Sequence, residues 1–263
     1  MPRHEDANEC YREPKQREGS VDVSLIIPAY NAVDTLRRTV EVAIDQLSSI
    51  TDSYEVIVAE DGSTDGTAEL AEELSRACES VVHLHSDERC GKGRALSKAM
   101  RVSRGRVIAF MDADLAAEPS QLKALIEGVR EKGYDCSIGS RRLSESVVER
   151  PFKRWIATEV YNIMARVLLA SKVHDHQCGF KAFKAEAAER LFSLQRRDDW
   201  SFDAEVLALA ERLGYRIAEV PVRWAHVQET SKVRPLRDGI RSLRALWAIR
   251  RDLAAGRYGA LKS

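Results

Sequence analysis

Two patterns of apolar positions alternate along the first half of the chain. Short runs of consecutive apolar residues, typical of strands buried on both faces, alternate with stretches in which apolar residues recur at helical spacing. The expected strands are residues 21–27, 54–59, 81–85 and 107–111. Strand and helix alternate four times within about 100 residues, which predicts an α/β fold with a mostly parallel central sheet and helices on both faces.

The second half of the chain has a looser pattern. It predicts helices over about 119–132, 152–169 and 202–213, and strands over 136–140 and 216–222. No internal repeat, low-complexity segment or clean linker interrupts the sequence. We therefore expect one domain with extensions at its ends.

Polar residues follow the ends of the four expected strands of the first half. They are Tyr30, Asn31, Glu60, Asp61, Lys92, Asp112 and Asp114. Ligands of open α/β sheets bind in the crevice outside the carboxyl ends of the strands. The sequence therefore predicts that these side chains meet in one site.

Asp112 and Asp114 directly follow the buried run 107–111. Buried charge is costly unless it is paired or holds a metal. Carboxylate oxygens suit Mg²⁺ or Mn²⁺, which in turn can carry a diphosphate. The pair alone is a weak signal, because an acidic residue also caps many helices. The other strand-end motifs favour the metal site.

Composition excludes some classes of protein. The formal net charge of the 263 residues is zero, so global charge indicates no nucleic-acid partner. The five scattered cysteines form no Cys-x-x-Cys pair, which predicts neither a disulfide framework nor a zinc site and favours a reduced, intracellular setting. No apolar stretch approaches the roughly 20 residues of a membrane span, and the polar start is unlike a secretory signal.

Four motifs of the first half, in this order and spacing, resemble family 2 glycosyltransferases of the GT-A fold. They are Pro28-Ala-Tyr-Asn31, Glu60-Asp-Gly-Ser-Thr-Asp-Gly-Thr67, Gly91-Lys-Gly93 and Asp112-Ala-Asp114. Three later motifs are similar to the dolichyl-phosphate glucosyltransferase and mannosyltransferase branch, and closer to the glucosyltransferases. They are Gly139-Ser-Arg141, Asp175-His-Gln-Cys-Gly-Phe-Lys181 and Trp200-Ser-Phe-Asp-Ala-Glu205. The resemblance covers about residues 22–250.

The resemblance implies a nucleotide-sugar site. Asp61, beside Glu60, would accept the N–H of the base, and Tyr30 would pack near the base or ribose. Lys92 adds charge to a helix start, where N–H groups favour phosphate. The ion held by the two aspartates would stabilise charge on the leaving diphosphate. The expected donor-binding residues are Pro28, Tyr30, Asn31, Glu60, Asp61, Gly62, Ser63, Lys92, Asp112 and Ala113.

Two positions depart from the family pattern on the nucleotide side. Ala32 stands where the family usually has Glu, and Glu60 replaces the first Asp of an Asp-Asp pair. The identity of the base therefore stays open.

The acceptor implied by this branch is a lipid phosphate. A phosphate dianion is already a nucleophile, so it needs a basic cradle rather than a strong general base. Arginine binds phosphate well because it offers bidentate hydrogen bonds. The expected acceptor-binding residues are Arg141, Arg150, Arg154, Gln177 and Lys181. A solvated basic helix face is the alternative for Arg150 and its neighbours Arg142 and Lys153.

The expected catalytic residues are Asp112, Asp114, Asp203 and Arg141. Asp203 matches a later acidic motif of the family, and a helix-capping or surface carboxylate is the alternative. His174 and His176 flank Asp175, but their spacing and the lack of a partner argue against a metal site there. Cys178 is expected to be a small apolar packing residue.

Three segments are expected. Residues 1–20 form a charged, mobile tail, and 21–225 form the transferase domain, with a donor half over about 21–118 and an acceptor half over about 119–225. Residues 226–263 carry six more positive than negative charges. Within them, a basic amphipathic helix containing Trp247 suits peripheral attachment to anionic lipid on the cytoplasmic face of a membrane. The alternative is a helix packed on the domain with its arginines in water.

The sequence thus favours an inverting, metal-dependent glycosyltransferase that moves a hexose, glucose from UDP-glucose by preference, onto a polyprenyl or dolichyl phosphate. The first alternative is the same fold acting on a soluble or polysaccharide acceptor. A sugar nucleotidyltransferase is less consistent, because those enzymes usually have a glycine-rich loop with Arg and Lys after the first strand. A dinucleotide-binding enzyme lacks support, since no Gly-x-Gly-x-x-Gly follows any expected strand. A catalytically inactive binding module is disfavoured by the intact aspartate pair.

Overall fold

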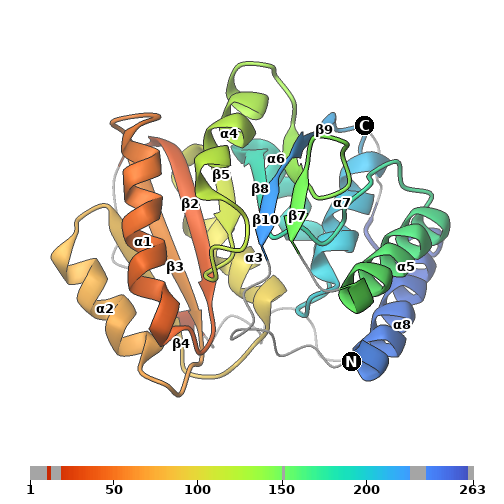
Figure 1. Ribbon diagram of the computed structural model, residues 1–263, viewed down its shortest axis with the longest axis horizontal. Helices are drawn as coiled ribbons and strands as arrows, with labels where there is room; N and C mark the ends of the chain where they lie inside the picture. The colour runs from red at the N-terminus through yellow and green to blue at the C-terminus, as the bar shows by residue number, and fades with distance from the viewer. Residues whose placement is uncertain (1–10, 13–18, 150–151, 226–234, 260–263) are drawn as a thin grey trace.

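The computed structural model describes residues 11–12, 19–149, 152–225 and 235–259, with the side chains of residues 12, 152–154 and 235–240 outside the description. At its centre is an eight-stranded sheet (Figure 1). Its strands are, in spatial order, β1 (Tyr11–Arg12), β4 (Val81–Ser86), β3 (Tyr54–Asp61), β2 (Val21–Ala29), β5 (Gly105–Met111), β8 (Phe180–Lys184), β6 (Cys136–Ser140) and β9 (Ile217–Pro221).

The sheet is mostly parallel. Strands β4, β3, β2 and β5 run in one direction, and β9 is parallel to β6. Strand β8 is antiparallel to both β5 and β6, and β1 is antiparallel to β4. A separate parallel pair joins β7 (Val147–Glu149) to β10 (Arg223–Ala225). The carboxyl ends of β2, β3, β4 and β5 therefore lie along one edge, as the sequence predicts.

Helices cover both faces of the sheet. On one face lie α1 (Val33–Ser48), α2 (Thr67–Ala77) and α4 (Leu122–Arg130), the last preceded by the 3₁₀ turn η2 (Pro119–Gln121). On the other face lie α3 (Lys92–Val102), α6 (Ala185–Leu194) and α7 (Phe202–Arg212). Helices α5 (Phe152–Leu169) and α8 (Pro235–Ala254) lie side by side beyond α7 (Figure 1).

The apolar strand runs follow from this layering. Leu25 and Ile27 of β2 pack in the α1 side core, whereas Ile26 between them packs in the α3 side core. Successive side chains of a strand point to opposite faces, so a strand covered on both faces needs apolar residues at every position. This burial on both faces explains why the predicted strands are continuous runs of apolar residues.

The expected α/β fold is confirmed, with local differences. Strand β8 and helix α6 were not predicted, because lysines interrupt the apolar pattern of 180–184. Tyr11 and Arg12, expected in the mobile tail, form β1, and Tyr11 is buried. The rest of the tail, residues 1–10 and 13–18, lies outside the described residues, as do 226–234 and 260–263 of the C-terminal extension.

Helix α8 packs on the domain through its apolar face. Leu246 and Ile249 are buried among residues of α5 and α7, including Ala165 and Ala208. Arg244 and the other described arginines of the helix are exposed. The packed arrangement, one of the two expectations, is therefore present. None of the described helices is long and apolar enough to cross a membrane.

The packing of Phe183 in the core predicts how strongly its replacement lowers the free energy of unfolding. Its ring stacks at 6.3 Å on Phe110 and meets the Phe192 ring edge-on at 5.7 Å, each measured between centroids. Phe183→Ala should lower the free energy of unfolding by about 3–5 kcal/mol, because it removes a fully buried ring and leaves a cavity. Val167→Ala, at an exposed position of α5, should change it by no more than about 0.5 kcal/mol. Urea unfolding measures both, and equal effects would contradict this description of the core.

Candidate active site

The loops after β2 and β3 are joined by hydrogen bonds from Asn31. Its backbone N–H donates to Ser63 Oγ at 3.0 Å, and its Oδ1 accepts the Thr64 N–H at 2.9 Å. Asn31 has a φ of 48°, a left-handed conformation that asparagine tolerates better than most residues. Ala32 N–H donates to Thr67 Oγ1 at 2.8 Å. The first two expected donor-binding motifs thus form one connected rim.

Glu60 is fully buried at the end of β3. Its Oε1 accepts the Ser63 N–H at 2.5 Å, and its Oε2 lies 2.6 Å from Nδ1 of His85. The carboxylate of Glu60, which was expected among the donor-binding residues, therefore holds its own loop and the end of β4. Its burial and its partners give it a positioning role in this structure.

Asp61 connects three segments of the chain. Its Oδ1 accepts the Tyr11 hydroxyl and the Cys90 N–H, both at 2.8 Å, and its Oδ2 accepts the Gly91 N–H at 2.9 Å. Burial and the nearby Asp61 raise the pKa of Tyr11 far above its usual range, so its hydroxyl stays a donor. Gly62 follows with a φ of +67°, and a Cβ there would fall 2.4 Å from the Glu88 carbonyl carbon.

Arg89, which was not among the residues expected from the sequence, is a cation beside Tyr30. Its guanidinium carbon lies 4.0 Å from the centroid of the Tyr30 ring, within range of a cation–π interaction. It follows β4, as the other candidates follow their strands. The same strand-end argument would have found it. Tyr30 and Arg89 together offer a flat surface and a positive charge near Asn31.

Lys92 meets the aspartate pair. Its Nζ donates to Asp112 Oδ1 at 2.5 Å. Burial acts to lower the pKa of Lys92, but the charges of Asp112, Asp203 and Asp114 outweigh it, and the net pKa is raised. Burial and the neighbouring Asp112 raise the pKa of Asp114. Two carboxylates crowded in this way gain from a cation between them.

Gly179 makes room for Asp112. A Cβ at Gly179 would lie 2.0 Å from Asp112 Oδ2, and the Asp112 N–H donates to the Gly179 carbonyl at 3.2 Å. The loop before β8 therefore fixes the position of the Asp112 carboxylate. Cys178 beside it is buried, and burial raises the pKa of its thiol to about 12, as an inert packing residue requires.

Arg141 forms a buried bidentate pair with Asp175. Its Nε and Nη2 donate to the two carboxylate oxygens at 2.7 and 2.9 Å, and its backbone N–H donates to Oδ2 at 3.0 Å. Burial acts to lower the pKa of Arg141, but Asp175 outweighs it and the pKa is raised. The Trp224 ring lies 5.5 Å from the guanidinium carbon. Asp175 thus orients Arg141, an interaction the sequence did not predict.

Lys181 and Asp203 form a second buried pair. Nζ of Lys181 donates to Asp203 Oδ1 at 2.7 Å, to the Cys178 carbonyl at 2.5 Å and to the His176 carbonyl at 3.3 Å. Only 1% of Lys181 is exposed, and its three donors are used. The geometry gives Lys181, expected at the acceptor, the task of holding Asp203. Burial raises the pKa of Asp203 despite both nearby lysines.

The remaining expected acceptor residues are scattered. The Gln177 N–H donates to Asp175 Oδ1 at 3.2 Å, which places this residue beside the carboxylate that pairs with Arg141. Arg142 lies in the turn after β6 and pairs with Glu159 of α5. Arg150 lies outside the described residues, and so does the side chain of Arg154.

Two further expected donor-binding residues, Pro28 and Ala113, and the aromatic residue Trp200 lie at the same edge of the sheet. Pro28 is the partner of Ala59 in the β2–β3 ladder, and the Ala113 carbonyl accepts the Thr39 hydroxyl at 2.9 Å. Trp200, a motif residue to which the sequence gave no role, is 62% exposed, and its ring centroid lies 5.1 Å from Lys92 Nζ. An exposed indole beside this lysine suits packing against a sugar.

Residues 24–192 match the sequence profile of "Glycosyl transferase family 2". The chain belongs to this family. It is 42% identical over 235 residues to glycosyltransferase AglD of Haloferax volcanii, covering 87% of this chain and 38% of AglD. It is 34% identical to the dolichyl-phosphate beta-glucosyltransferase of Drosophila melanogaster, covering 88% of this chain and 74% of that protein.

The fold is also found among solved structures. Glucosyl-3-phosphoglycerate synthase from Mycobacterium tuberculosis, crystallised with Mn²⁺, UDP-glucose and phosphoglyceric acid, aligns with a TM-score of 0.61 at 20% identity. The alignment covers 90% of this chain and 86% of that one. The family resemblance, the glycosyltransferase class and the expected GT-A arrangement of a family 2 glycosyltransferase are thereby confirmed.

Gly179→Ala should lower the transferase activity of this family 2 glycosyltransferase at least about tenfold, because the added methyl group displaces the Asp112 carboxylate. Cys178→Ala, at the preceding buried position, is the matched control and should keep activity near that of the wild type. Circular dichroism verifies that both variants are folded. Full activity of a folded Gly179→Ala protein would show that the position of Asp112 does not matter.

Proposed function

We propose that this family 2 glycosyltransferase transfers glucose from UDP-glucose, with inversion, to a polyprenyl or dolichyl phosphate. The observation that carries the proposal is the charge arrangement at the sheet edge. Lys92 joins the Asp112 and Asp114 pair, and the oriented Arg141 is close enough that the charge of Asp112 acts on it. Relatives named dolichyl-phosphate beta-glucosyltransferase in Drosophila and Dictyostelium discoideum support the acceptor and the sugar.

A divalent ion, Mg²⁺ or Mn²⁺, fits the aspartate pair. The raised pKa of Asp114 reflects its burial beside Asp112, and a cation relieves this repulsion. Both residues offer the hard oxygens that these ions prefer. When bound, the ion would act as a Lewis acid toward the diphosphate. The Mn²⁺ and UDP-glucose of the M. tuberculosis structure are consistent with this choice.

The transfer requires little acid–base chemistry from the protein. A phosphate oxygen of the acceptor attacks the anomeric carbon, and the bond from that carbon to the diphosphate oxygen breaks on the opposite side. One in-line displacement inverts the configuration. Lys92 stabilises charge on the leaving group, and Arg141 attracts the phosphate of the acceptor. Asp175 and Lys181 act by holding Arg141 and Asp203 in place.

A sugar or other hydroxyl acceptor is the second candidate, because Asp203 has a raised pKa and could take a proton. Its 3% exposure and its pairing with Lys181 disfavour this function, since the base would have to reach the hydroxyl. A phosphate acceptor needs no such base.

The assay combines UDP- and GDP-sugars, Mg²⁺ or Mn²⁺, and either polyprenyl phosphate or a hydroxyl acceptor. We expect glucosyl phospholipid from UDP-glucose and polyprenyl phosphate. Asp114→Asn should lower kcat at least about a hundredfold, because the variant loses a charged metal ligand. Glu118→Gln is the control, because this acidic residue lies four positions later and its half-exposed side chain pairs with Arg223 rather than with the aspartate pair. Product with the hydroxyl acceptor alone would select the second candidate.

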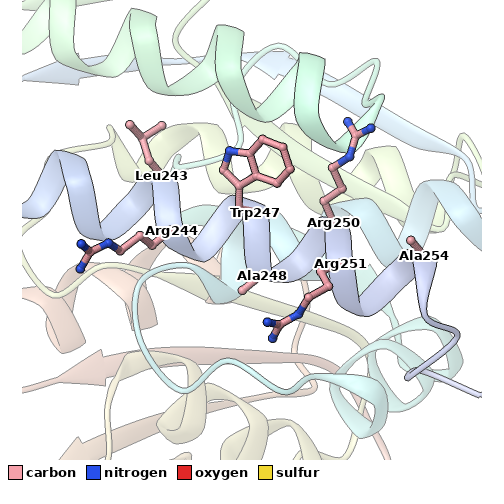
Figure 2. Close-up of a pocket in the computed structure, with 7 residues that line it drawn as sticks. All are labelled: Leu243, Arg244, Trp247, Ala248, Arg250, Arg251 and Ala254. Carbon is pink, nitrogen blue, oxygen red and sulfur yellow. The ribbon is translucent and has the colours of Figure 1, made fainter.

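The membrane part of the proposal rests on a surface that we call the α5–α8 surface. It consists of exposed apolar residues on α5 and exposed Trp and Arg residues on α8. They are Trp155, Ile156, Val160, Ile163, Val167, Arg244, Trp247, Arg250 and Arg251. Residues of α8 line an open hollow of about 700 Å³. In Figure 2, Trp247 projects to one side of the helix, and Arg244 and Arg251 project to the other.

Apolar side chains flanked by arginine suit the interface of an anionic bilayer. The apolar face of α8 packs on the domain, so α5 would supply most of the apolar contact with the bilayer. The sequence did not predict this role of α5. We therefore place this enzyme peripherally on the cytoplasmic face of a membrane, where a lipid phosphate would reach Arg141.

Replacing Ile163 and Arg244 together by glutamate should weaken binding to anionic vesicles by at least about tenfold, because it removes an apolar contact and reverses one charge. Arg106→Glu changes an exposed charge at the start of β5 and should leave binding unchanged. Sedimentation with anionic and neutral vesicles measures both. Equal binding of all three proteins would refute the α5–α8 surface without affecting the transfer assay in detergent.

A further inference from the structure

We propose a second metal site, formed by Glu60, His83 and His85, for a transition-metal ion such as Zn²⁺. Their ligand atoms lie within 4.8 Å of one another. Elsewhere in the described part of the chain, no other group of three histidine, cysteine or acidic side chains gathers in this way. The proposal does not rest on the proposed glucosyl transfer, and the site shares no residue with the Asp112 and Asp114 pair.

The strands place the three side chains on one face. Strands β3 and β4 are parallel, and Glu60 stands opposite His85 in their register. His83 precedes His85 by two positions, so its side chain points to the same face. The His-x-His pair and the carboxylate thus come from the rigid ends of two neighbouring strands, rather than from loops.

In Glu60 and His85, one polar atom is held by the surrounding chain, and the other faces its counterpart across the two strands. Oε1 of Glu60 accepts the Ser63 N–H, which leaves Oε2 facing Nδ1 of His85 at 2.6 Å. Nε2 of His85 lies 3.2 Å from Asp87 Oδ1. A carboxylate on the second ring nitrogen is the usual outer partner of a metal-bound histidine. When the ion binds, the proton between Nδ1 and Oε2 leaves.

His83 supplies the third ligand. Its Nε2 is buried and has no hydrogen-bond partner among the described residues. An unpaired buried ring nitrogen is costly, and coordination would satisfy it. Burial, followed by the nearby His85, lowers the pKa of His83, so the ring is in the neutral form that binds metal.

The ligand set selects the kind of metal. Imidazole favours Zn²⁺, Ni²⁺ or Cu²⁺, whereas Mg²⁺ prefers oxygen ligands. Two histidines and one carboxylate leave a further coordination position open. Strand β4 is three places from β5 in the sheet, which at the usual strand spacing is about 14 Å. The proposed ion therefore cannot share ligands with Asp112.

An ion at this site would fix the donor rim. Glu60 holds the Ser63 N–H, and Ser63 Oγ accepts the N–H of Asn31. Coordination would tie this hydrogen-bonded loop to the end of β4. The expected consequence is a more stable protein in the presence of Zn²⁺, with a rim already ordered before the donor binds.

Metal-free protein is titrated with Co²⁺, a spectroscopic substitute for Zn²⁺, and followed by visible absorption. We expect one Co²⁺ bound with the intense absorption of a low-coordinate site, and its displacement by Zn²⁺. His83→Gln and His85→Gln should each abolish the absorption. Asp87→Ala should weaken Co²⁺ binding about tenfold, as loss of an outer partner does. Asp112→Asn with Asp114→Asn should leave the absorption unchanged.

His174 provides a matched control. Its Nδ1 lies 2.6 Å from Glu219 Oε2, the same pair and distance, but no third ligand joins them among the described residues. His174→Gln should keep the Co²⁺ spectrum of the wild type. Zn²⁺ should raise the Tm of the wild type and of His174→Gln but not of His83→Gln. Absence of the absorption in the wild type, or its persistence in both His83→Gln and His85→Gln, overturns the site.

Discussion

Compensation of buried charge is the constraint on which this structure depends. Lys92 with Asp112, Lys181 with Asp203, and Arg141 with Asp175 all lie at or near one edge of the sheet. Their side chains have little exposure to solvent, except that of Asp112, which is 37% exposed. An unpaired charge in such a place would cost several kcal/mol, so each pair fixes the segments that carry it. The pairs join α3 to β5, β8 to α7, and β6 to the loop before β8.

This constraint links the fold to the chemistry. The same pairing that makes burial tolerable holds a lysine, two aspartates and an arginine in fixed positions before any substrate arrives. Such preorganisation is the main way in which a protein lowers the barrier of a displacement that needs no strong base. Gly179 illustrates how little space is left, because no side chain fits between its backbone and Asp112. In the proposed reaction, these charges would act on the donor and the acceptor from positions that the protein has already fixed.

Away from these charge pairs, two other features of the molecule are notable: exposed apolar residues on α5 and a polar cluster on β3 and β4. Helices α5 and α8 pack against each other through one face, and apolar residues on another part of α5 are exposed to solvent. Burying that surface elsewhere is favourable, which is consistent with a partner as apolar as a bilayer. At the other side of the sheet, the histidines of β4 and Glu60 form a polar cluster where an apolar strand face would be expected. Both features lie apart from the aspartate pair.

The sequence by itself determined the parallel sheet, most helices and the polar residues at strand ends, because buried strands and amphipathic helices leave local periodic signals. It also carried the family motifs. Only the tertiary structure decided which charges pair, since Arg141 and Asp175 are 34 positions apart and Tyr11 and Asp61 are 50 apart. Strand β8 was missed for the same reason. The lysines of 180–184 interrupt its apolar pattern, and the burial of Lys181 becomes possible only through Asp203, 22 positions later.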